Sequence, residues 1–362
     1  MAPAAPDPLR LVLPGEIYAV VGHEMCIYFD NIVLTPNLRN YVFDVDCLRG
    51  RQDQDRWRYS PAAEDVGDLG LTIKVLDGLN NVLASATTIV HVVPADAGAG
   101  KELTLLCVGD SLTNASVYPG ELWSLFSAEG NAKLTMVGTN RPGGGYPPEV
   151  GHEGYGGWRW ETFCTKWAET DNRGDRSRFL RLVDGEPVLD FQAYCDENNG
   201  GRAPDFITVL LGCNDTFGAT EDVLEATIDR MMGYADTLLA EFRRVGPDTQ
   251  IGILLLVPPA ASQDAFGSNY KCGQTRWQYR RNQHRVVERQ IEKWGGREAE
   301  NIFLIPAEVN LDSEHNYPTA AEPFNARNEE QVARQSNGVH PAATGYRQIA
   351  DSIYAWLKYR QR

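Results

Sequence analysis

The sequence of 362 residues has no long hydrophobic run, which excludes a membrane-spanning helix. None of its apolar stretches approaches the ~20 residues that are needed to cross a bilayer. The first residues, Met1–Pro6, have neither the basic nor the strongly apolar segment of a signal peptide. We therefore expect a cytoplasmic protein if Met1 is the native start, and a secreted or periplasmic one if a leader was removed.

Positive charge is scarce compared with negative charge. The chain has 34 lysines and arginines against 49 aspartates and glutamates, so its net charge is −15. Surfaces that bind nucleic acids are basic, so we expect neither a nucleic-acid nor a membrane partner. With 43% hydrophobic and 23% charged residues, the composition is that of a folded globular protein rather than a disordered one.

Paired cysteines are also missing. The chain has seven widely spaced cysteines and no Cys-x-x-Cys pair: Cys26, Cys47, Cys107, Cys164, Cys195, Cys213 and Cys272. This spacing excludes the usual zinc sites and a compact disulfide framework, so we expect free thiols and no metal.

Two patterns of secondary structure divide the chain. Residues 16–93 contain short stretches rich in β-branched and aromatic residues, such as 17–21, 25–32 and 82–93, separated by Gly, Asp and Asn turns. This pattern predicts a small all-β sandwich. Residues 94–100 are a linker by composition. We therefore expect an accessory domain over residues 1–98 and a catalytic domain over residues 99–362.

Strands and helices alternate after the linker. We expect buried strands near residues 103–108, 205–211, 250–257 and 301–305, and helices near 224–242, 276–294 and 346–357. Such alternation is typical of an α/β domain with three layers, in which helices cover both faces of a mainly parallel sheet. Residues 312–336 read as a polar, irregular loop, and a loop this long near a sheet end is often functional.

A candidate nucleophile follows the first of these strands. The strand Leu103–Val108 runs into Gly109-Asp110-Ser111-Leu112. Ligands of open α/β sheets bind beyond the carboxyl ends of the strands, where backbone N–H groups can also stabilise an oxyanion. A serine at this position is therefore well placed to attack a substrate, although four residues alone fit an ordinary turn as well.

Three other stretches are expected at the same end of the sheet. They are Glu153–Trp158 in a glycine-rich loop that begins at Arg141, Gly212–Asp215 after the second strand, and Asn337–Pro341 before the last helix. Glycines let backbone N–H groups approach a substrate oxygen, an asparagine offers an amide donor, and a histidine accepts a proton. The glycine loop lacks the lysine of a phosphate-binding P-loop.

The four stretches together resemble the SGNH (GDSL-type) hydrolase family over about residues 100–362. The serine of that family matches Ser111, the asparagine matches Asn214, and the histidine matches His340. The glycine matches Gly157, with Gly156 as the alternative. The resemblance implies the flavodoxin-like SGNH fold. The chain also resembles bacterial carbohydrate acetyl esterases that carry an N-terminal β-sandwich.

The resemblance also implies ester hydrolysis through an acyl-enzyme, without a metal or other cofactor. Ser111 would attack the ester carbonyl, and His340 would act first as a base and then as an acid. The backbone N–H groups of Ser111 and Gly157, with the Asn214 side chain, would form the oxyanion hole. Trp158 and Asp110 are candidate substrate-binding residues; the alternatives are core packing for Trp158 and an Asx-type turn for Asp110.

The chain departs from the family at Asn337, where the family usually has an aspartate. Asparagine can accept the Nδ1–H of His340, but it cannot offset the charge of the imidazolium. Three readings follow: Asn337 orients His340 alone, or another acceptor such as Glu153, Glu329 or a backbone carbonyl does so, or the third acid is lost and activity is weak.

We expect a serine esterase that removes acetyl or other short acyl groups, with a small-molecule or oligosaccharide ester as substrate. The alternatives are a lipid or thioester hydrolase with the same chemistry, and a catalytically weakened carbohydrate-binding protein. The sequence leaves the oligomeric state open. His152 and His315 either line the site or lie on the surface, and neither is assigned a role.

Overall fold

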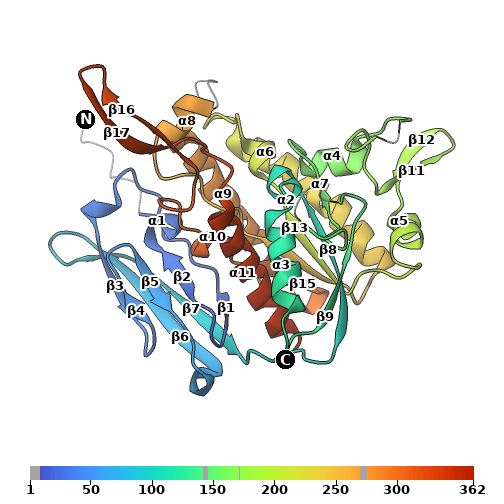
Figure 1. Ribbon diagram of the computed structural model, residues 1–362, viewed down its shortest axis with the longest axis horizontal. Helices are drawn as coiled ribbons and strands as arrows, with labels where there is room; N and C mark the ends of the chain where they lie inside the picture. The colour runs from blue at the N-terminus through green and yellow to red at the C-terminus, as the bar shows by residue number, and fades with distance from the viewer. Residues whose placement is uncertain (1–8, 142–145, 171, 270–274) are drawn as a thin grey trace.

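The computed structural model describes residues 9–141, 146–170, 172–269 and 275–362 (Figure 1). Its helices are α1 Phe29–Ile32, α2 Ser111–Asn114, α3 Val117–Ser127, α4 Trp160–Thr165, α5 Phe191–Asn198, α6 Cys213–Thr216, α7 Leu224–Val245, α8 Asp264–Asn269, α9 Arg276–Trp294, α10 Ala307–Asn310 and α11 Ala343–Arg360. Its strands are β1 Glu16–Val20, β2 Met25–Tyr28, β3 Val42–Asp46, β4 Arg51–Gln52, β5 Arg56–Tyr59, β6 Gly67–Leu76, β7 Val82–Val93, β8 Glu102–Gly109, β9 Lys133–Val137, β10 Glu153–Gly154, β11 Leu180–Val183, β12 Glu186–Leu189, β13 Phe206–Leu210, β14 Gln250–Leu254, β15 Ile302–Ile305, β16 Thr319–Asn325 and β17 Asn328–Gln335.

The N-terminal part is the expected β-sandwich. A four-stranded sheet in the order β1-β7-β6-β3 packs against a three-stranded sheet in the order β2-β5-β4. Phe29 and Phe43 stack with their ring centroids 4.3 Å apart, and Trp57 is buried in the same core. One detail differs from the sequence prediction: the strand expected over residues 25–32 ends at Tyr28, and a helical turn follows. The turn carries Asn31, whose amide donates to the carbonyl groups of Glu308 and Leu311.

The second part is the expected α/β domain. In the described residues, β8, β13, β14 and β15 form consecutive parallel pairs, and β9 and β10 both pair in parallel with β8. Strand β13 is buried at every position, because helices cover both faces of the sheet. Helices α3 and α11 pack against each other on one side, and α4, α7 and α9 form the other layer.

Strand β1 joins the two parts, because its two faces belong to different cores. Ile17 and Ala19 are buried in the sandwich, whereas Tyr18 and Val20 are buried in the core of the α/β domain. Helix α11 packs on β1 and β7 of the sandwich and on β15 of the central sheet, so it lies between the two parts. The sandwich is therefore an integral layer of the molecule and not a tethered module.

The segment between the two parts is compact. Residues 94–100 form successive turns, in which Ala97 donates to the Pro94 carbonyl and Ala99 to the Asp96 carbonyl. Ala97 is buried, and a side chain at Gly98 would collide with Gln361. The glycines thus allow close packing here. The domain boundary near residue 98 remains a prediction.

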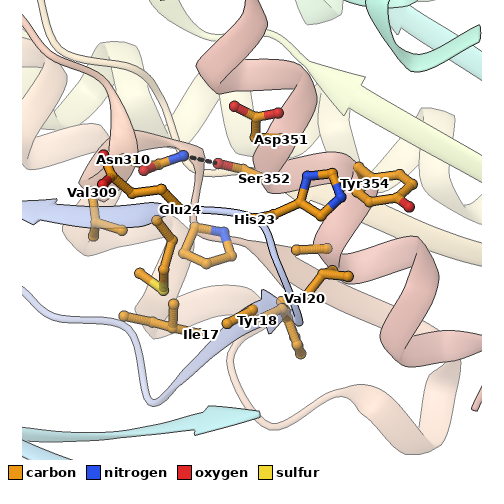
Figure 2. A pocket seen from close by; sticks show the side chains of 14 residues that line it. Ile17, Tyr18, Val20, His23, Glu24, Val309, Asn310, Asp351, Ser352 and Tyr354 are labelled. Atoms are coloured by element: carbon orange, nitrogen blue, oxygen red, sulfur yellow. Dashed lines mark hydrogen bonds between the residues drawn. The ribbon is translucent and has the colours of Figure 1, made fainter. Parts of the chain in front are cut away.

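A small cavity of about 20 Å³ lies in the junction between β1, β2 and α11 (Figure 2). Figure 2 shows His23 against Tyr354, and their rings are 5.1 Å apart. On the opposite side, Asn310 donates to Ser352. This volume is close to that of a single water molecule, so the junction is well packed.

Residues 312–336 are not the irregular loop that the sequence predicts. Most of this stretch forms the antiparallel hairpin β16–β17, which projects from the α/β domain on the side of the sandwich (Figure 1). Both faces of the hairpin are largely exposed. The apolar alternation that identifies a half-buried strand is therefore missing from its sequence.

Candidate active site

Ser111 lies where β8 ends and α2 begins, as the sequence predicts. Position 109, two residues before Ser111, must be glycine, since a Cβ atom there would collide with Thr113 Oγ1 and the Leu210 carbonyl. The chain therefore turns tightly, and α2 starts directly after the strand. The Ser111 side chain is held at the carboxyl end of the sheet and remains partly exposed.

His340 reaches Ser111 from the loop before α11. The distance from His340 Nε2 to Ser111 Oγ is 2.8 Å, although the two residues are 229 positions apart. Burial lowers the pKa of His340 below its usual value of 6.5. The imidazole is therefore neutral at neutral pH, and a neutral Nε2 can accept the serine proton.

Asn337 shapes the turn that carries His340. Its side-chain oxygen accepts hydrogen bonds from the backbone N–H groups of Val339, at 3.1 Å, and His340, at 2.9 Å. This is an Asx-type turn. The backbone of the histidine is thus fixed by the residue that replaces the usual aspartate of the family.

Asp110 is the residue that caps the start of helix α2. Its carboxylate is fully buried and accepts hydrogen bonds from the Leu112 N–H, the Cys213 thiol and the Asn214 amide. Burial raises the pKa of Asp110 to about 6. These contacts fit the expected Asx-type cap. The substrate-binding role of Asp110 stays a prediction.

Asn214 and Gly157 are two of the expected oxyanion-hole residues. Asn214 Nδ2 donates to Asp110 Oδ2 and to the Trp158 carbonyl, both at 3.1 Å, so the second and third motifs are in direct contact. Gly157 is exposed and has a φ of +76°, a conformation that favours glycine. Among the described residues other than its chain neighbours, none has an atom within 4 Å of the position of a Cβ atom there.

Trp158 packs in an aromatic cluster beside the glycine loop. Its side chain is buried and stacks on Tyr155, with centroids 4.2 Å apart, and it meets the edge of Phe163 at 4.8 Å. Lys166 lies over the remaining ring face. These contacts fit the alternative of core packing, and the substrate-binding role of Trp158 stays a prediction.

Of the other candidate acceptors for His340, Glu153 lies in a buried hydrogen-bond network and Glu329 lies on the exposed hairpin. Glu153 accepts hydrogen bonds from Thr139, Tyr155 and Tyr194, so its buried carboxylate ties the glycine loop to its neighbours. Glu329 is exposed on the hairpin strand β17. Neither residue is shown in contact with the imidazole of His340.

His152 is fully buried rather than at the surface. Its Nδ1 accepts from the Gly154 N–H, so the proton of the neutral ring is on Nε2, which donates to Ser116 Oγ at 2.8 Å. Burial lowers the pKa of His152 to about 4. This second serine–histidine pair is structural, because the imidazole donates to the serine instead of accepting its proton.

Sequence reasoning missed the role of Cys213, which donates from its buried thiol to Asp110. Its position one residue before Asn214 was the available signal. Six cysteines are free thiols; Cys272 lies outside the described residues, as do the glycines at 143–145. Among the described residues, no group of three or more His, Cys, Asp or Glu side chains is arranged to bind a metal, and no helix could cross a membrane.

Comparisons with solved structures give resemblances at low sequence identity. The family 3 carbohydrate esterase of Clostridium thermocellum is 17% identical with a TM-score of 0.42, over 70% of this chain and 94% of its own. A carbohydrate acetylesterase family member from Sinorhizobium meliloti is 14% identical with a TM-score of 0.40, over 71% and 98% of the two chains. No curated protein matches the sequence.

The comparison with protein families covers most of the α/β domain. The model of the GDSL-like lipase/acylhydrolase family matches residues 105–353, a range that contains Ser111, Gly157, Asn214 and His340. This match spans more than half of the chain. The protein is therefore an ester hydrolase, and it belongs to the GDSL-like lipase/acylhydrolase family.

Proposed function

We propose that the protein is a serine esterase that removes acetyl or other short acyl groups from carbohydrates through a Ser111–His340 dyad. The observation that carries this proposal is the 2.8 Å hydrogen bond between Ser111 Oγ and His340 Nε2 at the carboxyl end of the sheet. A hydroxyl in contact with a neutral imidazole is the arrangement that activates a serine nucleophile.

The first half of the reaction forms an acyl-enzyme. His340 Nε2 takes the proton of Ser111 as Oγ forms a bond to the ester carbonyl carbon, which gives a tetrahedral oxyanion. The C–O bond to the alcohol then breaks, and the imidazolium gives its proton to the departing alkoxide. In the second half, water replaces the alcohol, and the same proton transfers release the acid and restore Ser111.

Three donors are proposed to stabilise the oxyanion: the backbone N–H groups of Ser111 and Gly157 and the amide of Asn214. In the structure, Asn214 donates to Asp110 and to the Trp158 carbonyl. An oxyanion would compete with the neutral Trp158 carbonyl for one of these hydrogens, and its full charge makes it the stronger acceptor. Asp110 would keep the amide oriented during this exchange.

Asn337 is proposed to orient His340 by fixing its backbone turn. It supplies no negative charge to balance the imidazolium that forms during the reaction. We therefore expect a working dyad that is slower than a triad with an aspartate at this position.

The experiment compares wild type and Ser111→Ala on aryl esters of increasing acyl length and on acetylated xylan and mannan oligosaccharides. We expect wild type to hydrolyse acetyl esters faster than esters of longer acyl groups. We expect Ser111→Ala to show no hydrolysis above background. A preference for long acyl chains would contradict the acetyl assignment. A wild-type rate in Ser111→Ala would contradict the dyad, and tight glycan binding without turnover would indicate a binding protein instead.

A further inference from the structure

A second concave site lies outside the Ser111–His340 pair. It is a cleft of about 1040 Å³ between the β-sandwich and the hairpin β16–β17. This size exceeds that of most sites for single small molecules. The sandwich lines it with Asn37, Arg39, Tyr41 and Gln54, among others, and the hairpin with Val332 and Gln335.

The two walls of the cleft are held in fixed positions by hydrogen bonds across the domain junction. Tyr28 donates to Asp312, and the backbone N–H of Cys26 donates to Asn310. The Asn31 amide adds two further bonds to the carbonyl groups of Glu308 and Leu311. The cleft is therefore preformed, and binding a ligand would not cost the free energy of closing it.

The floor of the cleft is joined along the chain to the loop that carries His340. Gln335 is buried and joins three segments: its Oε1 accepts from the Ser262 N–H, and its Nε2 donates to the carbonyl groups of Ser313 and Glu314. Only five positions separate Gln335 from His340, a stretch that spans at most about 18 Å. An extended ligand a few sugar units long covers a distance of this order.

The chemistry of the cleft favours an uncharged, hydroxyl-rich ligand. Six charged or titratable side chains of the lining are paired with one another, in Arg276–Asp30, Arg334–Asp264 and His315–Asp312, and the lining also contains Arg39, Asp55 and Glu314. The amides of Asn37 and Gln54 are exposed and can both donate and accept, and Tyr41 offers a partly exposed ring. The net charge of −15 opposes anionic polymers.

We propose that this cleft binds the uncharged carbohydrate chain whose ester is hydrolysed at Ser111. The inference rests on the proposed esterase function and adds to it a binding site for the sugar residues next to the acylated one. Asn37, Gln54 and Arg39 contribute hydrogen bonds, and Tyr41 contributes a ring for packing against a sugar face. The hairpin forms the opposite wall.

The test uses Tyr41→Ala and Gln54→Ala, with Leu79→Ala as a matched control. Leu79 is an exposed side chain of the same sandwich, outside the cleft. Each enzyme is assayed on 4-nitrophenyl acetate and on acetylated xylan oligosaccharides of increasing length, and thermal unfolding verifies folding. In wild type, kcat/KM should rise with chain length. Tyr41→Ala and Gln54→Ala should lower kcat/KM on long chains by roughly three- to tenfold. Their kcat/KM on the aryl ester should equal that of wild type.

Equal behaviour of the cleft variants and Leu79→Ala on long chains would overturn the cleft proposal, while turnover of the aryl ester would still support the esterase. If wild type cleaves no ester, calorimetry with unacetylated xylan oligosaccharides tests the cleft separately. If wild type binds these oligosaccharides and Tyr41→Ala binds them more weakly, the result supports the cleft proposal. No binding by wild type, or tighter binding of an acidic polysaccharide, contradicts it.

Discussion

Two turns of the same form carry histidines in this chain, and only one of them faces a serine. In Asn337–His340, the Asn337 oxygen accepts from the N–H groups two and three residues later, at 3.1 and 2.9 Å. In Asp312–His315, Asp312 Oδ1 makes the same two bonds at 3.0 and 2.9 Å. The Asp312 carboxylate also lies 3.1 Å from His315 Nδ1.

The same turn can therefore orient an imidazole at two places. The groups around each imidazole determine its chemical role. The His315 side chain is 68% exposed, while His340 is partly buried with Nε2 at 2.8 Å from Ser111. The Asp312 turn also shows that an aspartate can hold both the backbone and the ring. An aspartate at position 337 therefore fits the same geometry.

The largest predicted effect separates the two histidines. His340→Ala should lower kcat on 4-nitrophenyl acetate by about 10²–10⁴-fold, because it removes the general base. His315→Ala should keep kcat within about twofold of wild type, since we place no reacting group beside it. Similar losses in both variants would break the comparison.

A smaller effect is expected at the first residue of each turn. Asn337→Asp should raise kcat/KM on the same ester about tenfold, because a carboxylate stabilises the imidazolium that forms in the transition state. Asp312→Asn is the matched control and should leave the aryl-ester rate unchanged. Unchanged activity in Asn337→Asp would mean that another group already balances the charge on His340.

The smallest effect is a shift in pH dependence. Burial lowers the pKa of His340, so the acid limb of kcat/KM in wild type should lie below pH 6.5. The activity depends on the neutral imidazole and is lost as pH falls through this pKa. A negative charge in Asn337→Asp favours the protonated form, so the limb should move about one unit upward. A limb that stays in place would show that the new carboxylate does not reach the ring.

Much of this architecture follows from sequence patterns, because buried strands and amphipathic helices leave a clear periodicity. The positions of β8, β13, α7 and α9 are examples. The hairpin β16–β17 could not be predicted, since both of its faces are exposed. The helical turn α1 depends on contacts with residues some 280 positions away, which no local pattern contains.

The candidate site shows the same limit. The motifs around Ser111 and His340 predicted their contact, because both follow the ends of elements that meet at one edge of the sheet. The burial of Trp158 and Asp110 was not predictable. A tryptophan beside a glycine and an aspartate before a serine fit a substrate contact as well as a supporting one, and only the packing around them distinguishes the two.

The central claim is that Ser111 is a nucleophile activated by His340, and covalent labelling tests it most directly. Wild type, Ser111→Ala and His340→Ala would be incubated with an alkyl fluorophosphonate and analysed by intact mass and peptide mapping. We expect one adduct on Ser111 in wild type, none in Ser111→Ala and much slower labelling in His340→Ala. Active wild-type enzyme that stays unlabelled, or an adduct at another residue, would contradict the account.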